Sequence, residues 1–159
     1  GMVAEKRPFQ GILYAGLIQT ATGPKVIEFN ARFGDPETQV VLARLESPLS
    51  EIISSLLAKE QPTIVWNELA SVGVVVAAEG YPNQYKTNLP LPEMSGETIY
   101  YAGVTRSEQA LVSAGGRIFL AEATASTLEE ARKKVYQTLD NYSFPGMYYR
   151  KDIGVKGLI

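Results

Sequence analysis

The stretch VIEFNARFGDPETQ, residues 26–39, crowds polar side chains that could perform chemistry between apolar ones. Glu28 and Asn30 are two residues apart, and side chains at this spacing point to the same face of a β-strand. A carboxylate and an amide oxygen on one face suit a Mg²⁺ ion that keeps water ligands and takes further oxygens from substrate phosphates. Polar residues also alternate with apolar ones on ordinary surface strands, so the spacing alone leaves both interpretations open. We call Glu28 and Asn30 the candidate metal pair.

The residues after this pair could bind other parts of a substrate. Arg32 would offer a planar, permanently charged group to a phosphate or carboxylate. Asp35 precedes Pro36, which is the pattern of a helix N-cap followed by proline at the first helical position. Glu37 would lie in the first turn, where a carboxylate complements the helix dipole. For Asp35 and Glu37 a structural role and contact with a ligand are therefore both open.

An antiparallel hairpin is expected to position these side chains. The runs GILYAGLIQT (11–20) and KVIEFN (25–30) are rich in β-forming residues and are separated by ATGP, which predicts two strands joined by a turn. On the second strand, Ile27 and Phe29 alternate with the candidate metal pair. We expect these two apolar side chains to hold the strand against the core.

Two short helices are predicted after the hairpin. The first starts at Asp35-Pro36 and continues to about Leu45. The second starts at Ser47-Pro48 and continues to about Lys59, because five apolar residues recur there at helical spacing: Leu49, Ile52, Ile53, Leu56 and Leu57. The helical pattern then stops and Pro62 follows, so the sequence predicts a domain boundary that divides residues 1–62 from residues 63–159.

The second half of the sequence is predicted to be rich in strands. Three runs have strand character, and the last is entered through the turn residues Gly115-Gly116: SVGVVVAAEGYP (71–82), ETIYYAGV (97–104) and RIFLAEATA (117–125). The run MYYRKDIG (147–154) predicts a final strand followed by a polar turn. Together with the helices, these strands predict an α+β fold.

One long helix is predicted between these strands and the final one. Thr127 as N-cap and Glu130 three residues later form a capping-box pattern. The helix should bury a stripe of five residues: Leu128, Ala131, Val135, Leu139 and Tyr142.

Composition excludes several classes of function. The sequence has no Cys and no His, which removes thiol or imidazole nucleophiles and every thiolate or imidazole metal site, so a metal would have to be a hard cation bound by oxygens. Fifteen Lys and Arg against seventeen Asp and Glu give a net charge of −2, and this balance does not favour a nucleic-acid partner. No apolar run approaches the length of a membrane span, and the start GMVAEKRPFQG does not resemble a signal peptide. We therefore expect a cytoplasmic protein, and the uncapped start suggests a fragment.

A resemblance adds to this interpretation. The run LYAGLIQTATGPKVIEFNARFGDPETQVVLARL (13–45) resembles the end of the ATP-grasp domain of the glycinamide ribonucleotide synthetase family, also called phosphoribosylamine-glycine ligases, and RFGDPETQ resembles the signature of that family. The likeness continues, in the order of the family, through ASVGVVVAAEGYP, YYAGV, GGRIFLAEATASTLEEARKKVY and YRKDIG. It covers nearly the whole chain but only the C-terminal part of such an enzyme.

The resemblance implies an ATP-dependent carbon-nitrogen ligase of purine biosynthesis. In that family the carboxylate of glycine is phosphorylated by ATP, and the amine of 5-phosphoribosylamine attacks the acyl phosphate to give glycinamide ribonucleotide, ADP and phosphate. The resemblance also implies a fold in which the C-terminal part of an ATP-grasp domain, a hairpin with two helices, precedes a small β-rich domain packed with one long helix. The partners would be these three substrates and the missing N-terminal part of the same chain, with no nucleic acid and no membrane, and the fragment alone would be inactive.

The resemblance further implies roles for individual residues. Glu28 and Asn30 would bind Mg²⁺, or Mn²⁺, at the nucleotide phosphates. Arg32 would hold the transferring phosphoryl group or the acyl phosphate, and Asp35 would serve catalysis near the amine substrate. The substrate would be contacted by Arg32 and by the loop that follows it: Gly34, Asp35, Pro36 and Glu37. Two alternatives stay open, namely an ATP-grasp carboxylate-amine ligase for a different acid, and a binding module without catalysis.

Overall fold

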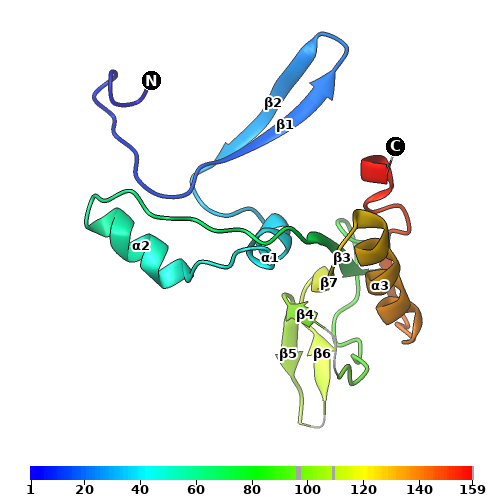
Figure 1. The fold of residues 1–159 in the computed structure, drawn as a ribbon. Coiled ribbons are helices and arrows are strands. Elements are labelled where there is room, and N and C mark those ends of the chain that lie inside the picture. The colour runs from blue at the N-terminus through cyan, green and yellow to red at the C-terminus, as the bar shows by residue number, and fades with distance from the viewer. Residues whose placement is uncertain (96–97, 109, 159) are drawn as a thin grey trace. The chain divides into compact units, whose positions relative to one another are not determined.

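The structure is a computed structural model that describes residues 1–95, 98–108 and 110–158. The chain forms two compact units, which are described separately below (Figure 1). Unit 1 comprises residues 1–38 and 45–66, and unit 2 comprises residues 39–44 and the chain from residue 67 onward. Helix α1 (Glu37–Leu42) begins in unit 1 and ends in unit 2. The sequence-based boundary between residues 62 and 63 stays a prediction.

The main element of unit 1 is the predicted antiparallel hairpin, formed by β1 (Tyr14–Thr20) and β2 (Gly23–Asn30). Gly16 lies opposite Glu28 and Leu17 opposite Val26, so Ile27 is the extra residue of a β-bulge. The expectation that Ile27 and Phe29 pack into a core is wrong for this structure, because their side chains are 67% and 63% exposed. A two-stranded hairpin has two open faces, and the apolar side chains of this one stay accessible to solvent.

The second helix of unit 1, α2 (Leu49–Leu57), lies close to its predicted position, but it starts differently from the prediction. Pro48 occupies the N-cap position, and no side chain caps the helix there. The hydroxyl of Ser47 instead accepts a hydrogen bond from Val65 N at 2.8 Å and donates to Thr63 O at 3.2 Å. Ser47 therefore fixes the returning chain rather than the helix end, and of the predicted apolar stripe only Ile52 is buried.

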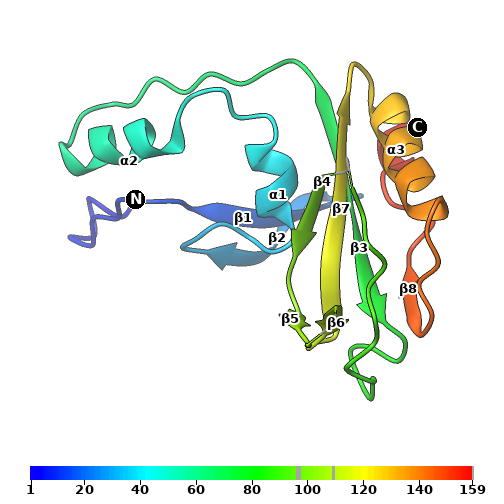
Figure 2. The same ribbon diagram turned by 90° about the horizontal axis from the view of Figure 1, so that it is seen from below.

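Unit 2 is built on a four-stranded antiparallel sheet with the strand order β4-β7-β3-β8 (Figure 2). Its strands are β3 (Ala70–Ala78), β4 (Thr98–Tyr101), β7 (Arg117–Ala125) and β8 (Met147–Tyr149). All four were predicted, although Glu97 at the start of one predicted run lies outside the described residues. A separate pair, β5 (Val104–Arg106) and β6 (Leu111–Ser113), was not predicted as a hairpin. A 3-10 helix, η1 (Val155–Leu158), follows the sheet.

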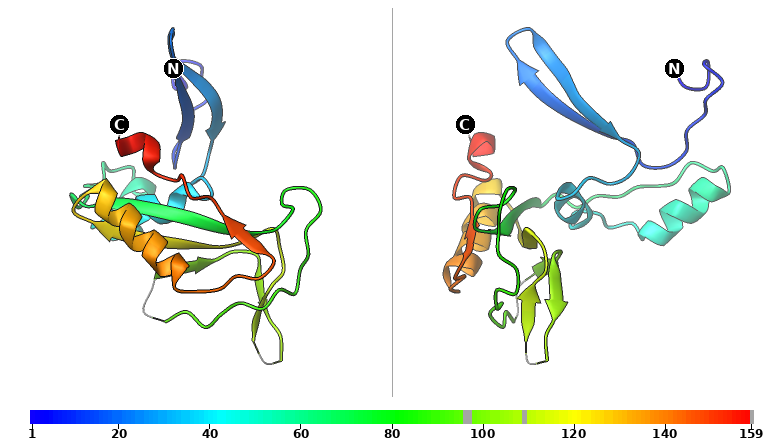
Figure 3. Two further views of the ribbon diagram at one scale, coloured as in Figure 1. Left: turned by 90° about the vertical axis from the view of Figure 1, so that its right-hand side faces the viewer. Right: turned by 180° about the vertical axis from the view of Figure 1, so that it is seen from behind.

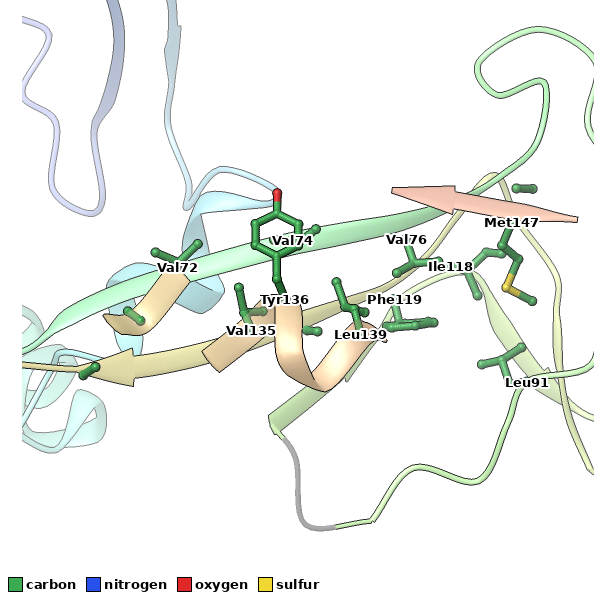
Figure 4. Close-up of a cluster of buried hydrophobic side chains, with 14 residues drawn as sticks. Val72, Val74, Val76, Leu91, Ile118, Phe119, Val135, Tyr136, Leu139 and Met147 are labelled. Atoms are coloured by element: carbon green, nitrogen blue, oxygen red, sulfur yellow. The ribbon is translucent and has the colours of Figure 1, made fainter. Parts of the chain in front are cut away.

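The core of unit 2 lies between this sheet and the long helix α3 (Leu128–Asp140) (Figure 4). Alternation along β3 brings Val72, Val74 and Val76 to the face covered by α3. Val135 and Leu139 of the helix are fully buried against them. The register of β7 shifts next to Ile118, and this bulge brings both Ile118 and its neighbour Phe119 into the core.

Helix α3 begins where the sequence predicts. Thr127 is extended, and its Oγ1 accepts a hydrogen bond from Glu130 N at 3.2 Å, which satisfies one of the free donors of the first turn. The buried stripe contains Ala131, Val135 and Leu139 as predicted. It also contains Tyr136, which the periodicity did not predict.

Two side chains of α3 bind the chain that follows β8. Arg132 donates from Nε to Ile153 O at 2.9 Å and from Nη2 to Lys151 O at 2.6 Å. The hydroxyl of Tyr136 donates to Arg150 O at 2.6 Å and accepts from Ile153 N at 3.1 Å. Helix α3 therefore holds residues 150–153 through their backbone. The chain that follows β8 runs back beside this helix (Figure 3).

The second face of the sheet contains a buried carboxylate. Glu122 is 8% exposed, and its Oε1 accepts a hydrogen bond from Ser71 Oγ at 2.7 Å. Burial raises the pKa of Glu122 above its ordinary value, and the hydrogen bond from Ser71 acts in the opposite direction. On the same face, Gly73 has no side chain, and this lets Val40 of α1 lie close to the sheet. A Cβ at Gly73 would be only 2.7 Å from Val40.

No helix in the described part of the chain is both long and apolar enough to cross a bilayer.

Candidate functional site

The β1–β2 hairpin brings the candidate metal pair together. Asn30 Nδ2 donates to Glu28 Oε1 at 3.0 Å, so the two side chains share one face of β2, as strand alternation predicts. Gly16 lies opposite Glu28, and a Cβ at that position would be only 3.2 Å from Glu28 Cγ. The small residue on β1 therefore leaves room for the carboxylate on β2.

The donor set of this pair fits a hard divalent cation. The hydrogen bond engages the amide nitrogen of Asn30, whereas the amide oxygen is the atom that would bind a metal. A carboxylate and an amide oxygen are ligands suited to Mg²⁺, which commonly takes only one or two protein ligands beside water and phosphate oxygens. No group of three or more acidic, Cys or His side chains suited to a metal occurs among the described residues. The two residues therefore fit an ion that takes its remaining oxygen ligands from water or from a phosphate.

A second contact on the hairpin involves Glu37, the first residue of α1. The hydroxyl of Tyr14 donates to Glu37 Oε1 at 3.2 Å, and Tyr14 is the cross-strand partner of Asn30. The hydrogen bond to Glu37 is the main cause of a raised pKa of Tyr14, and the negative charges of Glu37 and Glu28 act in the same direction. Tyr14 therefore lies within electrostatic reach of Glu28, the charged member of the candidate metal pair.

Sequence reasoning did not identify Tyr14 as part of this site. Its position could have been found from the hairpin itself, because pairing the two predicted strands around the ATGP turn brings a residue near position 14 opposite Asn30. The bulge at Ile27 shifts the pairing by one residue, and such an irregularity is not readable from periodicity.

Arg32 lies beyond the end of β2. Its guanidinium Nη1 donates to Phe33 O at 2.7 Å, and the side chain is exposed. The strand face that Glu28 and Asn30 share ends at Asn30, so strand alternation does not fix the direction of Arg32. Arg32 thus follows the candidate metal pair closely in sequence, but its guanidinium is hydrogen-bonded to the backbone of the next residue.

Helix α1 follows the loop from Gly34 to Pro36 and begins later than predicted. The helix begins at Glu37, two residues after Asp35. The N–H of Thr38, the donor that an N-cap at Asp35 would bind, donates to Gly34 O at 3.1 Å, and the Thr38 hydroxyl donates to the same carbonyl. The helix therefore begins one residue later than an N-cap at Asp35 predicts, and the carbonyl of Gly34 accepts the hydrogen bond from Thr38 N–H. Asp35 itself is exposed.

Comparison with known protein families identifies the class of the chain. The sequence model described as "Phosphoribosylglycinamide synthetase, ATP-grasp (A) domain" matches residues 1–38, which contain the hairpin, the candidate metal pair and the loop. The model described as "Phosphoribosylglycinamide synthetase, C domain" matches residues 71–156, more than half of the chain. The chain belongs to the phosphoribosylglycinamide synthetase family, and the predicted family and the α+β fold class are confirmed.

Individual relatives agree with this assignment. The chain is 51% identical to a phosphoribosylamine-glycine ligase of Halalkalibacterium halodurans, and the alignment covers 99% of this chain and 38% of that protein. It is 50% identical to the ligase of the same name from Lactococcus lactis, with 99% of this chain and 39% of that protein covered. The crystal structure of a phosphoribosylamine-glycine ligase from Thermotoga maritima is similar with a TM-score of 0.78 and 31% identity, over 88% of this chain and 36% of that one. The chain thus spans about two fifths of the length of the curated relatives it matches.

Proposed function

We propose that these residues contribute the metal-binding part of an ATP-grasp site and the adjoining C-terminal β-rich domain to a phosphoribosylamine-glycine ligase. The family and the names of the relatives support this proposal. Because the relatives are much longer than this chain, the activity is proposed for a longer polypeptide that contains these residues. Within it, residues 1–62 would belong to the ATP-grasp domain and residues 63–159 to the C-terminal domain, and the enzyme would act in the cytoplasm.

The proposed reaction joins glycine to 5-phosphoribosylamine in purine biosynthesis. ATP phosphorylates the glycine carboxylate, and the amine of 5-phosphoribosylamine then displaces phosphate from the acyl phosphate. The products are glycinamide ribonucleotide, ADP and phosphate. Such phosphoryl and acyl transfers need their reacting groups held in line and their negative charge balanced, and the protein can supply both by position and electrostatics.

The contact between Glu28 and Asn30 is the observation that carries the proposal. Asn30 Nδ2 lies 3.0 Å from Glu28 Oε1 on one face of β2. A carboxylate and an amide oxygen are therefore close enough together to bind one cation. A bound Mg²⁺ or Mn²⁺ would balance the charge of the nucleotide phosphates. The protein's own part is to keep the two ligand side chains together before the ion and the nucleotide bind.

The residues that follow the pair would bind the substrates. Arg32 has an exposed guanidinium whose fork geometry suits the phosphoryl group or the acyl phosphate. The loop residues Gly34, Asp35, Pro36 and Glu37 would contact substrate, with Asp35 close to the amine. Gly34, Asp35 and Pro36 lie between β2 and α1 and Glu37 is the first residue of α1, so all four follow the candidate metal pair closely, which supports these roles.

The exposed apolar side chains of the hairpin also support a longer polypeptide. Leu17, Val26, Ile27 and Phe29 are all more than half exposed, although their burial would be favourable by about 25 cal/mol per Å² of apolar surface. We propose that the rest of the ATP-grasp domain covers them.

A chimeric enzyme tests the proposed function. The part of the Halalkalibacterium halodurans ligase that precedes the aligned region would be joined to these 159 residues, and ADP formation would be measured with glycine and 5-phosphoribosylamine. We expect ADP formation that depends on both substrates and on Mg²⁺. Glu28→Ala should lower the rate at least about 100-fold, since it removes the charged ligand of the metal.

Glu60→Ala is the matched control, because Glu60 is an exposed carboxylate of the same unit outside the candidate site. This variant should keep the rate of the unmodified chimera. A folded chimera that uses another acid in place of glycine would contradict the substrate assignment. Activity that survives Glu28→Ala would contradict the metal site.

A further inference from the structure

Tyr14 and Glu37 form a contact that the proposed metal site does not use. The Tyr14 hydroxyl donates to Glu37 Oε1 at 3.2 Å across 23 residues of sequence. The two side chains come from different elements, because Tyr14 is the first residue of β1 and Glu37 is the first residue of α1. This contact therefore connects the start of the helix to the strand opposite the candidate metal pair.

The Glu37 carboxylate is also restricted from a second side. A Cβ at Gly34 would lie 2.0 Å from Glu37 Oε2 and 2.8 Å from Glu37 Cδ, so the carboxyl group lies directly over the bare backbone of this glycine. Gly34 is buried, and its carbonyl accepts hydrogen bonds from both the N–H and the hydroxyl of Thr38. The backbone on one side and a phenol hydroxyl on the other thus fix the orientation of the carboxylate.

The charge of this arrangement restricts what it could bind. A second carboxylate, that of Glu28, lies within electrostatic range of the same tyrosine. The Glu37 carboxylate repels the carboxylate of an amino acid and any phosphate whose charge no cation balances. It attracts an ammonium group or the N–H groups of an amine, which form charge-assisted hydrogen bonds to a carboxylate.

We propose that Tyr14 is a positioning residue that holds the Glu37 carboxylate as the acceptor for the amino group of a small substrate. The inference rests on the proposed function, in which two substrates carry such a group. The ammonium of glycine and the amine of 5-phosphoribosylamine share this chemistry. Tyr14 acts through Glu37 and does not itself touch the substrate.

The test uses a full-length polypeptide that carries these residues, with Tyr14→Phe, Glu37→Gln and both changes together. Tyr14→Phe keeps the ring and removes only the hydroxyl. It should raise the KM for one of the two amino substrates about threefold to tenfold, which corresponds to one lost hydrogen bond. The KM for ATP should stay within about twofold, because the Tyr14 hydroxyl is hydrogen-bonded to Glu37 and not to a ligand of the candidate metal pair. Separate titrations of glycine and 5-phosphoribosylamine identify which amino group is bound.

The double variant distinguishes positioning from a general structural role. If Tyr14 acts through Glu37, the double variant should be no worse than Glu37→Gln alone. Additive effects, or an equal rise of all three KM values together with a lower melting temperature, would overturn the inference. Tyr85→Phe, at an exposed tyrosine of unit 2, is the control and should leave every KM unchanged.

The failure of this inference and the failure of the proposed function can be told apart. An unmodified enzyme that forms no ADP with glycine would contradict the proposed function. An active unmodified enzyme whose KM values for both amino substrates are unaffected by Tyr14→Phe would contradict only the role of Tyr14.

Discussion

Two phenylalanines distinguish the two units of this chain. Phe119 of β7 is 1% exposed, whereas Phe29 of β2 is 63% exposed. Both lie on β-strands among apolar neighbours, so the strand pattern does not separate them. The difference is that α3 covers one face of the sheet in unit 2, whereas the hairpin of unit 1 is a single two-stranded layer. An apolar face becomes a core only when a second layer covers it.

The two phenylalanines give the largest expected contrast in stability. Phe119→Ala should lower the free energy of unfolding by about 3–5 kcal/mol, because it leaves a cavity in a closely packed core. Phe29→Ala should change it by less than about 0.5 kcal/mol, since the side chain is already exposed. Urea unfolding followed by circular dichroism measures both. Similar losses from the two variants would show that a layer covers the hairpin face in solution.

The N-cap of helix α3 gives a smaller expected effect. Thr127→Ala should destabilise the chain by about 1 kcal/mol, because the N–H of Glu130 loses its acceptor. Thr127→Ser keeps the hydroxyl and should stay within a few tenths of a kcal/mol of the unmodified chain. Thermal unfolding of the two variants at one pH measures the effect. A loss of the same size from Thr127→Ser would show that the threonine methyl, and not the cap, matters.

The smallest expected effect concerns the buried carboxylate of unit 2. The folded state raises the pKa of Glu122 above its ordinary 4.5. Its contribution to stability is therefore fully present below the pKa of the unfolded chain and is lost as the pH rises through the higher pKa of the folded chain. Glu122→Gln, which carries no charge, should be slightly more stable than the unmodified chain at pH 7.

Unfolding in urea between pH 4 and pH 7 measures this difference, which should shrink toward pH 4. Glu79→Gln, at an exposed position of the same unit, is the control. A constant loss of stability from Glu122→Gln at every pH would mean that the hydrogen bond from Ser71 outweighs the cost of burying the charge.

Local patterns predicted the elements of unit 2 well. The strand RIFLAEATA coincides with β7, and Thr127 caps α3 as expected, because alternation and capping depend on a few neighbouring residues. Tyr136 was missed because it is buried where its hydroxyl meets the backbone of residues 150 and 153, a contact that helical periodicity does not encode. Strand β6 was missed because three residues are too few to establish a period.

The candidate site was predicted in part. The shared face of Glu28 and Asn30 follows from strand alternation and was correct in geometry. The cap at Ser47 was wrong because its hydroxyl is hydrogen-bonded to the returning chain at Val65, and helix α1 begins one residue later than predicted. The place of Tyr14 in the site was not predicted, because it depends on strand pairing and on the bulge at Ile27, which a single segment of sequence does not reveal.

The attachment of residues 150–153 to helix α3 has a consequence for how the sequence can vary. Arg132 and Tyr136 bind backbone groups of these residues, so the contact does not depend on which side chains they carry. The ion pairs made by Arg150 and Lys151 are mostly exposed and add little stability. The attachment therefore relies on side chains of the helix, and positions 150–152 are suitable places to introduce a spectroscopic label.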